Sequence, residues 1–305
     1  MATIQEQVIL ADKCRFHVGG PADFYVEIVP TPEAVGAALA FAKEHGQQYF
    51  VYSGGTNLFF DDAGFRGLVI RVSGGSWQVS ANENKVTVSS GCDLWQVVRS
   101  LAEDHSLGGL DFLANIPGNV GGAVVGNAGC YGRGVADVLD SAVVYDTRID
   151  QTAKVPVDFF QYAYRHSRLK YSDRYIVLTV TLRVEPVADK QAVLRGIAAE
   201  LEERRQKHPH DAWCAGSYFK NPSREAAAWK LITDAGMAGA SVGGACLNPL
   251  HANFLMNAGK AKSSEIIELT RMIQRAVRDK SGHLLTPEVR YVSPTGVEEL
   301  LPEDA

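Results

Sequence analysis

Two glycine-rich segments are the places where this chain could bind a ligand through its backbone. The first runs from Ser53 to Leu58, and the second extends from Asn115 to Gly132. Glycine at this density costs conformational entropy on folding, so a plain loop gains nothing from it. It is expected where the main chain must come close to a large, flat ligand. The second segment therefore predicts a ligand site.

The first segment leaves two interpretations open. Ser53-Gly54-Gly55-Thr56-Asn57 follows a predicted strand, but it does not read G-x-G-x-x-G and no helical pattern follows it. A Rossmann dinucleotide site is therefore disfavoured. Consecutive backbone N–H groups could still form a nest for one anion. A tight surface turn is the alternative.

Composition excludes several classes of protein. The chain has 305 residues, of which 46% are hydrophobic and 21% charged, as in packed globular proteins. Its net charge of −5 argues against a nucleic-acid binder. The N-terminal residues do not resemble a signal peptide, and no apolar run reaches the roughly 20 residues of a membrane span. Five scattered cysteines suit reduced thiols, so we expect a cytoplasmic protein.

The elements that must position these segments alternate along the chain. The pattern predicts α+β architecture, with a mixed α/β region followed by a smaller C-terminal α+β domain. Predicted strands are 24–29, 48–52, 68–72, 85–89, 142–146, 175–184 and 288–293. Predicted helices begin at Thr31-Pro32, at Asp93 and near Ala226, and cover 190–206 and 263–280.

Several motifs, in one order along nearly the whole chain, resemble the UDP-N-acetylenolpyruvoylglucosamine reductase (MurB) family. The most specific is Ile116-Pro117-Gly118-Asn119-Val120-Gly121-Gly122-Ala123 within the second glycine-rich segment. The other matching blocks are 16–23, 53–58, 64–67, 164–167, 216–222, 251–254 and Glu288. The segment after Tyr171 is short, so the chain looks like the shorter subtype that lacks an extra tyrosine-bearing loop.

This resemblance implies a fold and an activity. The fold is a vanillyl-alcohol-oxidase/PCMH-type, two-lobed FAD-binding domain followed by an α+β substrate-binding domain. It implies lobes at 1–78 and 79–195 and a UDP-sugar-binding domain at 196–305. The activity is the NADPH-dependent reduction of the enolpyruvyl group of UDP-N-acetylglucosamine enolpyruvate to UDP-N-acetylmuramate, for peptidoglycan synthesis. FAD would be bound non-covalently, and no nucleic-acid or membrane partner is implied. We expect a monomer, although the sequence does not fix the oligomeric state.

The resemblance also assigns residues to the cofactor. Both glycine-rich segments would hold the FAD pyrophosphate and flank the isoalloxazine ring. Four positions depart from the family pattern at or beside these contacts, namely Ser53, Thr56, Asn119 and Gly126, and they leave FAD affinity and potential open. The implied FAD-binding residues are Ser53, Gly54, Gly55, Thr56, Asn57, Leu58, Ile116, Pro117, Gly118, Asn119, Gly121, Gly122, Asn127 and Gly129.

Three residues would carry the chemistry. Arg165 offers a cationic fork for a carboxylate, although an arginine in such a context is often only a surface residue. By resemblance it polarises the enolpyruvyl carboxylate, Ser217 donates the proton, and Glu288 lies beside the carboxylate. Taken alone, Ser217 would be read as a turn residue and Glu288 as a solvated carboxylate.

Other polar residues are candidates for the UDP-sugar. Lysine binds a phosphate as a point charge, yet lysines near helix ends are usually solvated. A metal site is not expected at His208 and His210, because no carboxylate or cysteine lies at ligand spacing. The candidate substrate-binding residues are Tyr164, Lys207, Lys220, Asn221 and His251.

Two other functions fit parts of the pattern. An FAD-dependent sugar or alcohol oxidase of the same superfamily would need no UDP site, so the blocks around Ser217 and His251 disfavour it. A catalytically silent paralogue that binds flavin or nucleotide sugar would have no reason to keep Arg165, Ser217 and Glu288 together.

Overall fold

The computed structural model describes residues 2–207 and 212–302, which form two compact units. The first unit comprises Met1–Gln5, Phe24–Gly54 and Leu68–Glu203. The second unit comprises Glu6–Asp23, Gly55–Gly67 and Arg204–Ala305. The predicted FAD-binding lobes at 1–78 and 79–195 and the predicted UDP-sugar-binding domain at 196–305 stay a prediction.

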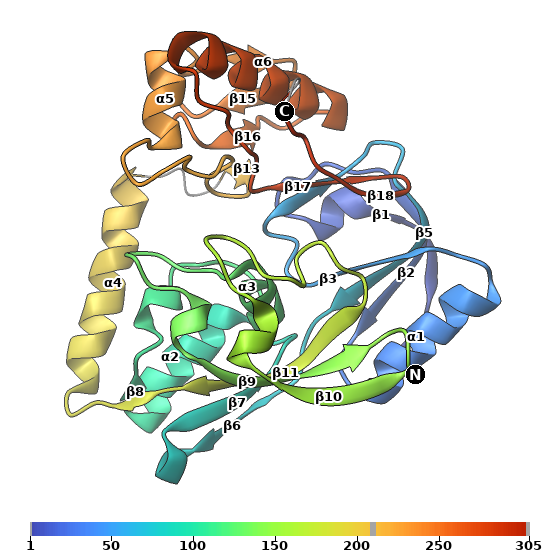
Figure 1. Cartoon of the computed structure of the whole chain (residues 1–305), viewed down its shortest axis with the longest axis vertical. Helices are drawn as coiled ribbons and strands as arrows, with labels where there is room; N and C mark the ends of the chain where they lie inside the picture. The colour runs from blue at the N-terminus through green and yellow to red at the C-terminus, as the bar shows by residue number, and fades with distance from the viewer. Residues whose placement is uncertain (1, 208–211, 303–305) are drawn as a thin grey trace. The chain divides into compact units, whose positions relative to one another are not determined.

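An antiparallel five-stranded sheet, in the order β10-β9-β11-β7-β6, forms the centre of the first unit (Figure 1). Helices α2 and α3 cover one face, and their buried side chains share one core with those of β7, β9 and β11. The strands are β6 (Trp77–Ser80), β7 (Lys85–Ser89), β9 (Leu139–Asp146), β10 (Gln151–Pro156) and β11 (Tyr175–Arg183), and the helices are α2 (Leu94–His105) and α3 (Val120–Gly126).

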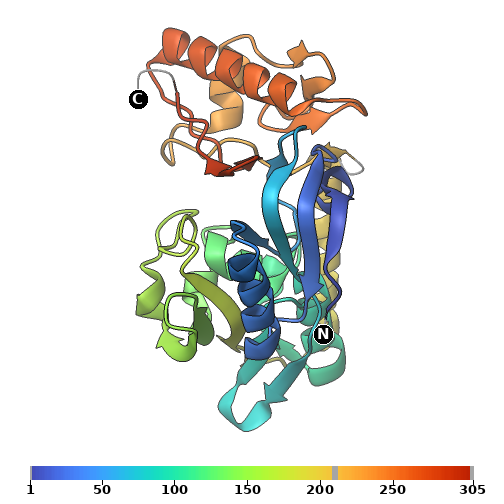
Figure 2. The ribbon, with the colours of Figure 1, turned by 90° about the vertical axis from the view of Figure 1, so that its right-hand side faces the viewer.

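A second core of this unit lies against α1 (Pro32–Glu44), which can be followed in Figure 2. Val35, Ala38 and Ala42 of α1 pack with apolar residues of β2 and β5 and with the opposite faces of β9 and β11. The sheet order is β1-β2-β5-β3, with β3 parallel to β5, and β1, β2 and β5 include residues of the second unit. Its strands are β1 (Gln5–Ile9), β2 (Pro21–Ile28), β3 (Tyr49–Tyr52) and β5 (Phe65–Val72).

In its described part, the second unit contains two small sheets and the helices α5 and α6. Helix α6 packs on α5 and on β14 and β15. The sheets have the orders β13-β16-β15-β14 and β18-β17-β4, with β4 parallel to β17. The elements are β4 (Leu58–Phe60), β13 (Trp213–Cys214), α5 (Ala228–Asp234), β14 (Ser241–Val242), β15 (Ala245–Leu247), β16 (Leu255–Asn257), α6 (Ser263–Ser281), β17 (Arg290–Ser293) and β18 (Gly296–Glu298).

Short elements complete the chain, and α4 (Lys190–Lys207) contributes residues to both units. Within residues 2–207 and 212–302, no helix is both long enough and apolar enough to cross a membrane. The short elements are β8 (Leu107–Gly108), β12 (Glu185–Pro186) and the 3-10 turns Leu10–Lys13, Ala81–Glu83, Asp111–Leu113, Val135–Asp137 and Val157–Phe160.

The predicted helix ends are confirmed at atomic detail. Thr31 Oγ1 accepts a hydrogen bond from the Ala34 N–H at 3.2 Å, and Asp93 Oδ1 accepts one from the Gln96 N–H at 2.9 Å. Gly282 ends α6 with a φ of 74°. Such side-chain caps satisfy N–H groups that the helix itself leaves unbonded.

Several features of the fold were not predicted, among them strands β1, β4, β6, β10 and β18. Helix α3 forms inside the second glycine-rich segment although its glycines disfavour a helix, because Val120, Ala123 and Val124 bury their side chains in the core. The sheet β13-β16-β15-β14 consists of strands of two or three residues, too short to show a period-2 pattern. Glu288 lies in a bend, and the last predicted strand begins at Arg290.

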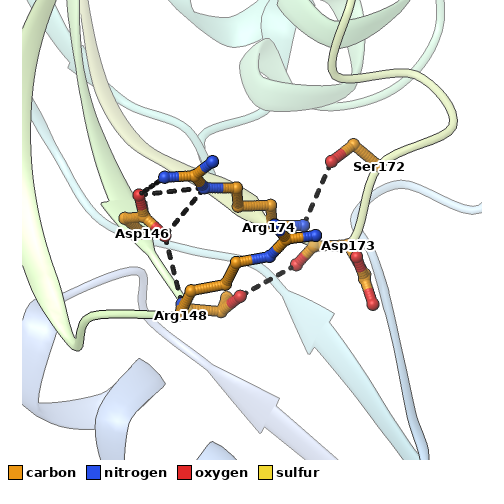
Figure 3. A network of polar contacts seen from close by, with 6 residues as sticks. Asp146, Arg148, Ser172, Asp173 and Arg174 are labelled. Carbon is orange, nitrogen blue, oxygen red and sulfur yellow. Dashed lines mark hydrogen bonds and ion pairs between the residues drawn. The ribbon is translucent and has the colours of Figure 1, made fainter.

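An ion pair between the buried Asp146 and the half-buried Arg174 joins the end of β9 to the residue before β11 (Figure 3). Both carboxylate oxygens of Asp146 accept hydrogen bonds from Arg174, with the Arg174 Nη2–Asp146 Oδ2 distance at 2.8 Å. Asp146 also accepts the Arg148 N–H at 3.1 Å. The hydrogen bonds from Arg174, above all, lower the pKa of Asp146. These contacts fix the end of the strand that leads into the β9–β10 hairpin.

We expect Asp146→Asn to lower the free energy of unfolding at neutral pH. Below neutral pH, the free energy of unfolding of the variant should depend less on pH than that of wild type. Because the pKa of Asp146 is lower in the folded state than in the unfolded state, its stabilisation is complete above the unfolded pKa. It is lost as the pH falls through the folded pKa. Urea unfolding of wild type and Asp146→Asn between pH 3 and pH 7 measures this, with exposed Asp158→Asn as control. Parallel profiles for wild type and Asp146→Asn would contradict the assignment.

Candidate active site

In the first unit, the start of the first glycine-rich segment meets the second segment at van der Waals distance. A Cβ atom built on Gly54 would lie 2.8 Å from Asn119 Oδ1 and 2.9 Å from Gly118 Cα. A Cβ on Gly122 would lie 3.0 Å from Ser53 Oγ. Glycine is needed at Gly54 because the two main chains touch there. The two segments that were predicted separately are therefore brought together.

The second segment is held in place by the loop before α2. The Gly121 N–H donates to Ser90 O at 2.8 Å, and a Cβ on Gly121 would lie 2.8 Å from Ser90 Cβ. Asn119 Nδ2 donates to Gly91 O at 2.5 Å. The departure from the family pattern at Asn119 thus has a structural function, because its amide ties the segment to the loop beside it.

Arg165 lies in a tight turn that is hydrogen-bonded to the residue at the C-terminal end of α3. Ala163 and His166 exchange two backbone hydrogen bonds of 3.1 Å, and Arg165 between them has a φ of 53°. Asn127, at the end of α3, donates through Nδ2 to Ala163 O at 3.0 Å. The Arg165 guanidinium carbon lies 5.4 Å from the ring centre of the exposed Tyr164. The structure therefore places Tyr164, Arg165 and the predicted FAD contact Asn127 together.

A buried lysine completes this turn, and sequence reasoning missed it. Lys170 is only 4% exposed, and its Nζ donates to Arg165 O at 2.9 Å. Nearby, Ser167 Oγ donates to Val125 O at 2.7 Å. A lysine five residues after a candidate arginine carries no recognisable spacing signal. Its burial could be found only from the structure.

In the second unit, the remainder of the first segment is tied to the strand that follows Glu288. Asn57 Nδ2 donates to Glu288 O at 3.2 Å, and the Arg290 N–H donates to Asn57 O at 3.1 Å. Leu58 opens β4, which pairs with β17. Gly55 has a φ of 64°, which suits glycine. Asn57 thus joins a predicted FAD contact to a predicted catalytic residue.

Ser217 is exposed, but the residues beside it are anchored. Gly216 precedes it with a φ of 82°, and Tyr218 and Phe219 follow with 0% and 1% exposure. The Tyr218 and Thr270 hydroxyl oxygens lie 2.8 Å apart, and burial raises the pKa of Tyr218. The phenol therefore stays neutral and anchors Tyr218 in the core. The backbone next to Ser217 is fixed as a result.

Ser217 and Glu288 lie on neighbouring, hydrogen-bonded segments of the second unit. Phe219 pairs with Pro287 as an antiparallel bridge, and the Glu288 N–H donates to Tyr218 O at 2.7 Å. The Lys220 N–H donates to Thr286 O at 2.9 Å. The structure brings together these two residues, which are far apart in the sequence, and half-buries Glu288.

The other candidate substrate residues have different surroundings. Asn221 Oδ1 accepts the Ala228 N–H at 2.9 Å and so caps α5. The His251 ring contacts Phe254 edge-on, with 4.7 Å between ring centres. Lys207 ends α4, and its side chain, like His208 and His210, lies outside the described residues. Among the described residues, no group of three histidine, cysteine, aspartate or glutamate side chains could hold a metal ion.

Comparison with known proteins identifies the family of the chain. Residues 25–150 match the FAD binding domain family, and residues 208–292 match the UDP-N-acetylenolpyruvoylglucosamine reductase C-terminal domain family. The reductase of Geotalea uraniireducens is 37% identical over 93% of this chain and 92% of its own length. The chain belongs to the UDP-N-acetylenolpyruvoylglucosamine reductase family.

Further members of the family cover the chain to the same extent. The reductase of Bacillus subtilis is 32% identical over 93% of this chain and 92% of its own length. The crystal structure of the reductase from Thermus caldophilus superposes with a TM-score of 0.79, at 30% identity, over 95% of this chain and 99% of that one. The predicted fold class and family are confirmed.

The glycine-rich segments fit the FAD that this reductase family uses. Gly54 lets the first loop lie against Gly118 and Asn119, and Gly121 lets the second loop lie against Ser90, since an added Cβ at either glycine would come within 3 Å of these neighbours. At Gly126 and Gly132 an added Cβ would meet nothing within 4 Å, so the segment also has open edges. A loop pair of this kind can approach a flat ring system and a pyrophosphate through its main chain.

We predict that Gly54→Ala weakens FAD binding about 10- to 100-fold, because a methyl group must push the Gly118–Asn119 backbone away. Overpacking of this kind costs about 1–3 kcal/mol, and about 1.4 kcal/mol is a factor of ten in affinity. The flavin absorbance per protein and the dissociation constant for FAD measure the loss. Gly196→Ala on α4 is the control, since a Cβ there meets nothing within 4 Å and Gly196 lies outside both glycine-rich segments. Equal FAD affinities in the two variants would contradict the interpretation.

Proposed function

We propose that this chain catalyses the NADPH-dependent reduction of UDP-N-acetylglucosamine enolpyruvate to UDP-N-acetylmuramate, in the cytoplasm and as a monomer. The observation that carries the proposal is the pairing of Ser217 and Glu288 on adjacent segments, linked by the 2.7 Å bond from the Glu288 N–H to Tyr218 O. Family membership over more than nine-tenths of the chain supports it.

The reaction sets two tasks for the protein. Hydride adds to one carbon of the enol ether and a proton adds to the other, so negative charge develops toward the substrate carboxylate. FAD, when bound, supplies the means to accept hydride from NADPH and deliver it to the substrate. The side chains must stabilise the developing charge and supply the proton.

Arg165 and Glu288 are assigned to the developing charge. A guanidinium binds a carboxylate through two parallel N–H donors, and Arg165 is held in its turn by Lys170 and Asn127. Glu288 is assigned to the carboxylate side of the substrate, next to the segment that carries Ser217.

Ser217 is assigned as the proton donor. A hydroxyl is a weak acid, so its oxygen must be placed within hydrogen-bond reach of the carbon that it protonates. The fixed turn between Gly216 and the buried Tyr218 supports such placement. We assign the UDP-sugar itself to Tyr164, Lys207, Lys220, Asn221 and His251.

An anaerobic absorbance titration tests the function. NADPH is added to the purified protein first, and the UDP-linked enolpyruvyl sugar second. The proposal requires flavin bands that bleach with NADPH and return only with that sugar. Reoxidation only by oxygen would indicate an oxidase, and a colourless protein a silent paralogue.

We predict that Ser217→Ala slows flavin reoxidation by the sugar about 10²- to 10⁴-fold, the range that a positioned general acid contributes. Flavin reduction by NADPH keeps its wild-type rate, because that step needs no proton at the substrate carbon. Stopped-flow absorbance measures both half-reactions. Ser264→Ala, an exposed serine on α6, is the control. Wild-type rates in both half-reactions of Ser217→Ala would remove Ser217 as the donor.

A further inference from the structure

We propose that Asn253 is a positioning residue for the reaction, which sets the placement of Ser217 and Glu288 through the backbone of Tyr218 and Phe219. The inference rests on the proposed function. Asn253 is 3% exposed and lies in the turn between β15 and β16 of the second unit. Sequence reasoning noted it only as part of the block 251–254 and gave it no function.

The Asn253 side-chain amide forms hydrogen bonds with both main-chain groups of Phe219, its N–H and its carbonyl oxygen. Asn253 Oδ1 accepts the Phe219 N–H at 2.8 Å, and Asn253 Nδ2 donates to Phe219 O at 2.9 Å. The backbone adds a third bond, since the Tyr218 N–H donates to Asn253 O at 2.7 Å. The amide thereby imitates the paired hydrogen bonds that a neighbouring β-strand would make.

The opposite edge of the same segment carries Glu288. Phe219 forms a bridge with Pro287, and Tyr218 O accepts the Glu288 N–H. Phe219 and Pro287 face each other as a non-hydrogen-bonded pair, so the bonds of the bridge come from their neighbours, including the Lys220 N–H to Thr286 O, and the missing N–H of Pro287 removes none of them. The 217–219 segment thus lies between Asn253 on one edge and the 286–288 segment on the other. A shift of Phe219 moves Ser217, which is two residues away, against Glu288.

Asn253 is itself held by a compact turn. Asn248 Oδ1 accepts the Leu250 and His251 N–H groups at 2.8 and 3.1 Å. The Asn248 N–H donates to Phe254 O at 2.8 Å, and the Asn253 N–H donates to His251 Nδ1 at 3.3 Å. Candidate substrate residue His251 and positioning residue Asn253 therefore belong to one rigid turn.

Asparagine is suited to this function in a way that its neighbours in size are not. Its short amide holds one donor and one acceptor in a single plane. Aspartate keeps the acceptor for the Phe219 N–H but, when ionised, loses the donor to Phe219 O. Alanine loses both and leaves two buried main-chain groups without their partners. Graded substitutions can therefore separate the two bonds.

The test compares the two half-reactions in Asn253→Ala, Asn257→Ala and wild-type holoenzyme. Asn257 is the matched control, because it is also buried and also bonds main-chain groups of the second unit, at Phe16 O and the Gly259 and Ala261 N–H groups. We expect Asn253→Ala to reoxidise with the UDP-linked enolpyruvyl sugar about 100-fold more slowly, the loss expected from a misplacement of about 1 Å. Flavin reduction by NADPH keeps its wild-type rate, and urea unfolding midpoints fall similarly in both variants.

Asn253→Asp keeps the side-chain volume and provides a second variant if Asn253→Ala does not fold. We expect its reoxidation rate to lie between those of wild type and Asn253→Ala. In a Ser217→Ala background, Asn253→Ala should slow reoxidation much less than it does alone, because both changes act on one proton donor. Binding of the product UDP-N-acetylmuramate, measured by calorimetry, should change less than the reoxidation rate.

The outcomes separate the inference from the function on which it rests. If wild type is not reoxidised by the sugar, the proposed function fails and the inference fails with it. If wild type is reoxidised but Asn253→Ala and Asn257→Ala show equal rates, only the inference is wrong. Full additivity with Ser217→Ala would also overturn it, because a general loss of stability acts independently of the proton donor.

Discussion

Contact between main chains is the constraint on which both predicted ligand regions depend. In the first unit, Gly54 meets Gly118 closely enough that a methyl group would separate them. In the second unit, the Tyr218 N–H donates to Asn253 O on one edge, and Tyr218 O accepts the Glu288 N–H on the other. Main-chain contacts of this kind do not depend on side-chain rotamers. They allow loops, which are otherwise the most mobile parts of a fold, to hold reactive groups in place.

The same principle connects the cofactor segments to the residues assigned to chemistry. Asn127 ends α3 and bonds the turn that carries Arg165, while Asn57 bonds the carbonyl group of Glu288. Each asparagine is a predicted FAD contact, and its side chain also hydrogen-bonds a backbone carbonyl group at or near a predicted catalytic residue. Substitutions at these two positions are therefore expected to alter flavin affinity and turnover together.

The sequence predicted the fold where local signals are strong. Thr31-Pro32 and Asp93 mark helix starts by capping chemistry, and the β-branched run at 175–184 marks a strand, so these elements were placed to within a few residues. Helix α3 was missed because its stability comes from burial of Val120 and Val124 in a core that only the complete fold creates.

The candidate site divides in the same way. The glycine-rich segments and the set Arg165, Ser217 and Glu288 could be named from motif order, but their supporting residues could not. Lys170 and Asn253 act through hydrogen bonds to backbone groups, and no residue type at a given spacing reports such a bond. Their function depends on which carbonyl or N–H group the fold brings within 3 Å.

The buried neighbours of Ser217 fix its position, which its own exposed side chain cannot do. Ser217 is exposed and short, so few contacts of its own can fix its oxygen. Its neighbours Tyr218 and Phe219 are almost completely buried, and Phe16 and Thr270 pack on or hydrogen-bond to Tyr218. The apolar core thus restrains the backbone that carries the hydroxyl. A displacement of Ser217 would have to expose the buried rings of Tyr218 and Phe219. A weak acid can act as proton donor only in such a fixed position, and this links the hydrophobic packing of the second unit to the chemistry proposed for it.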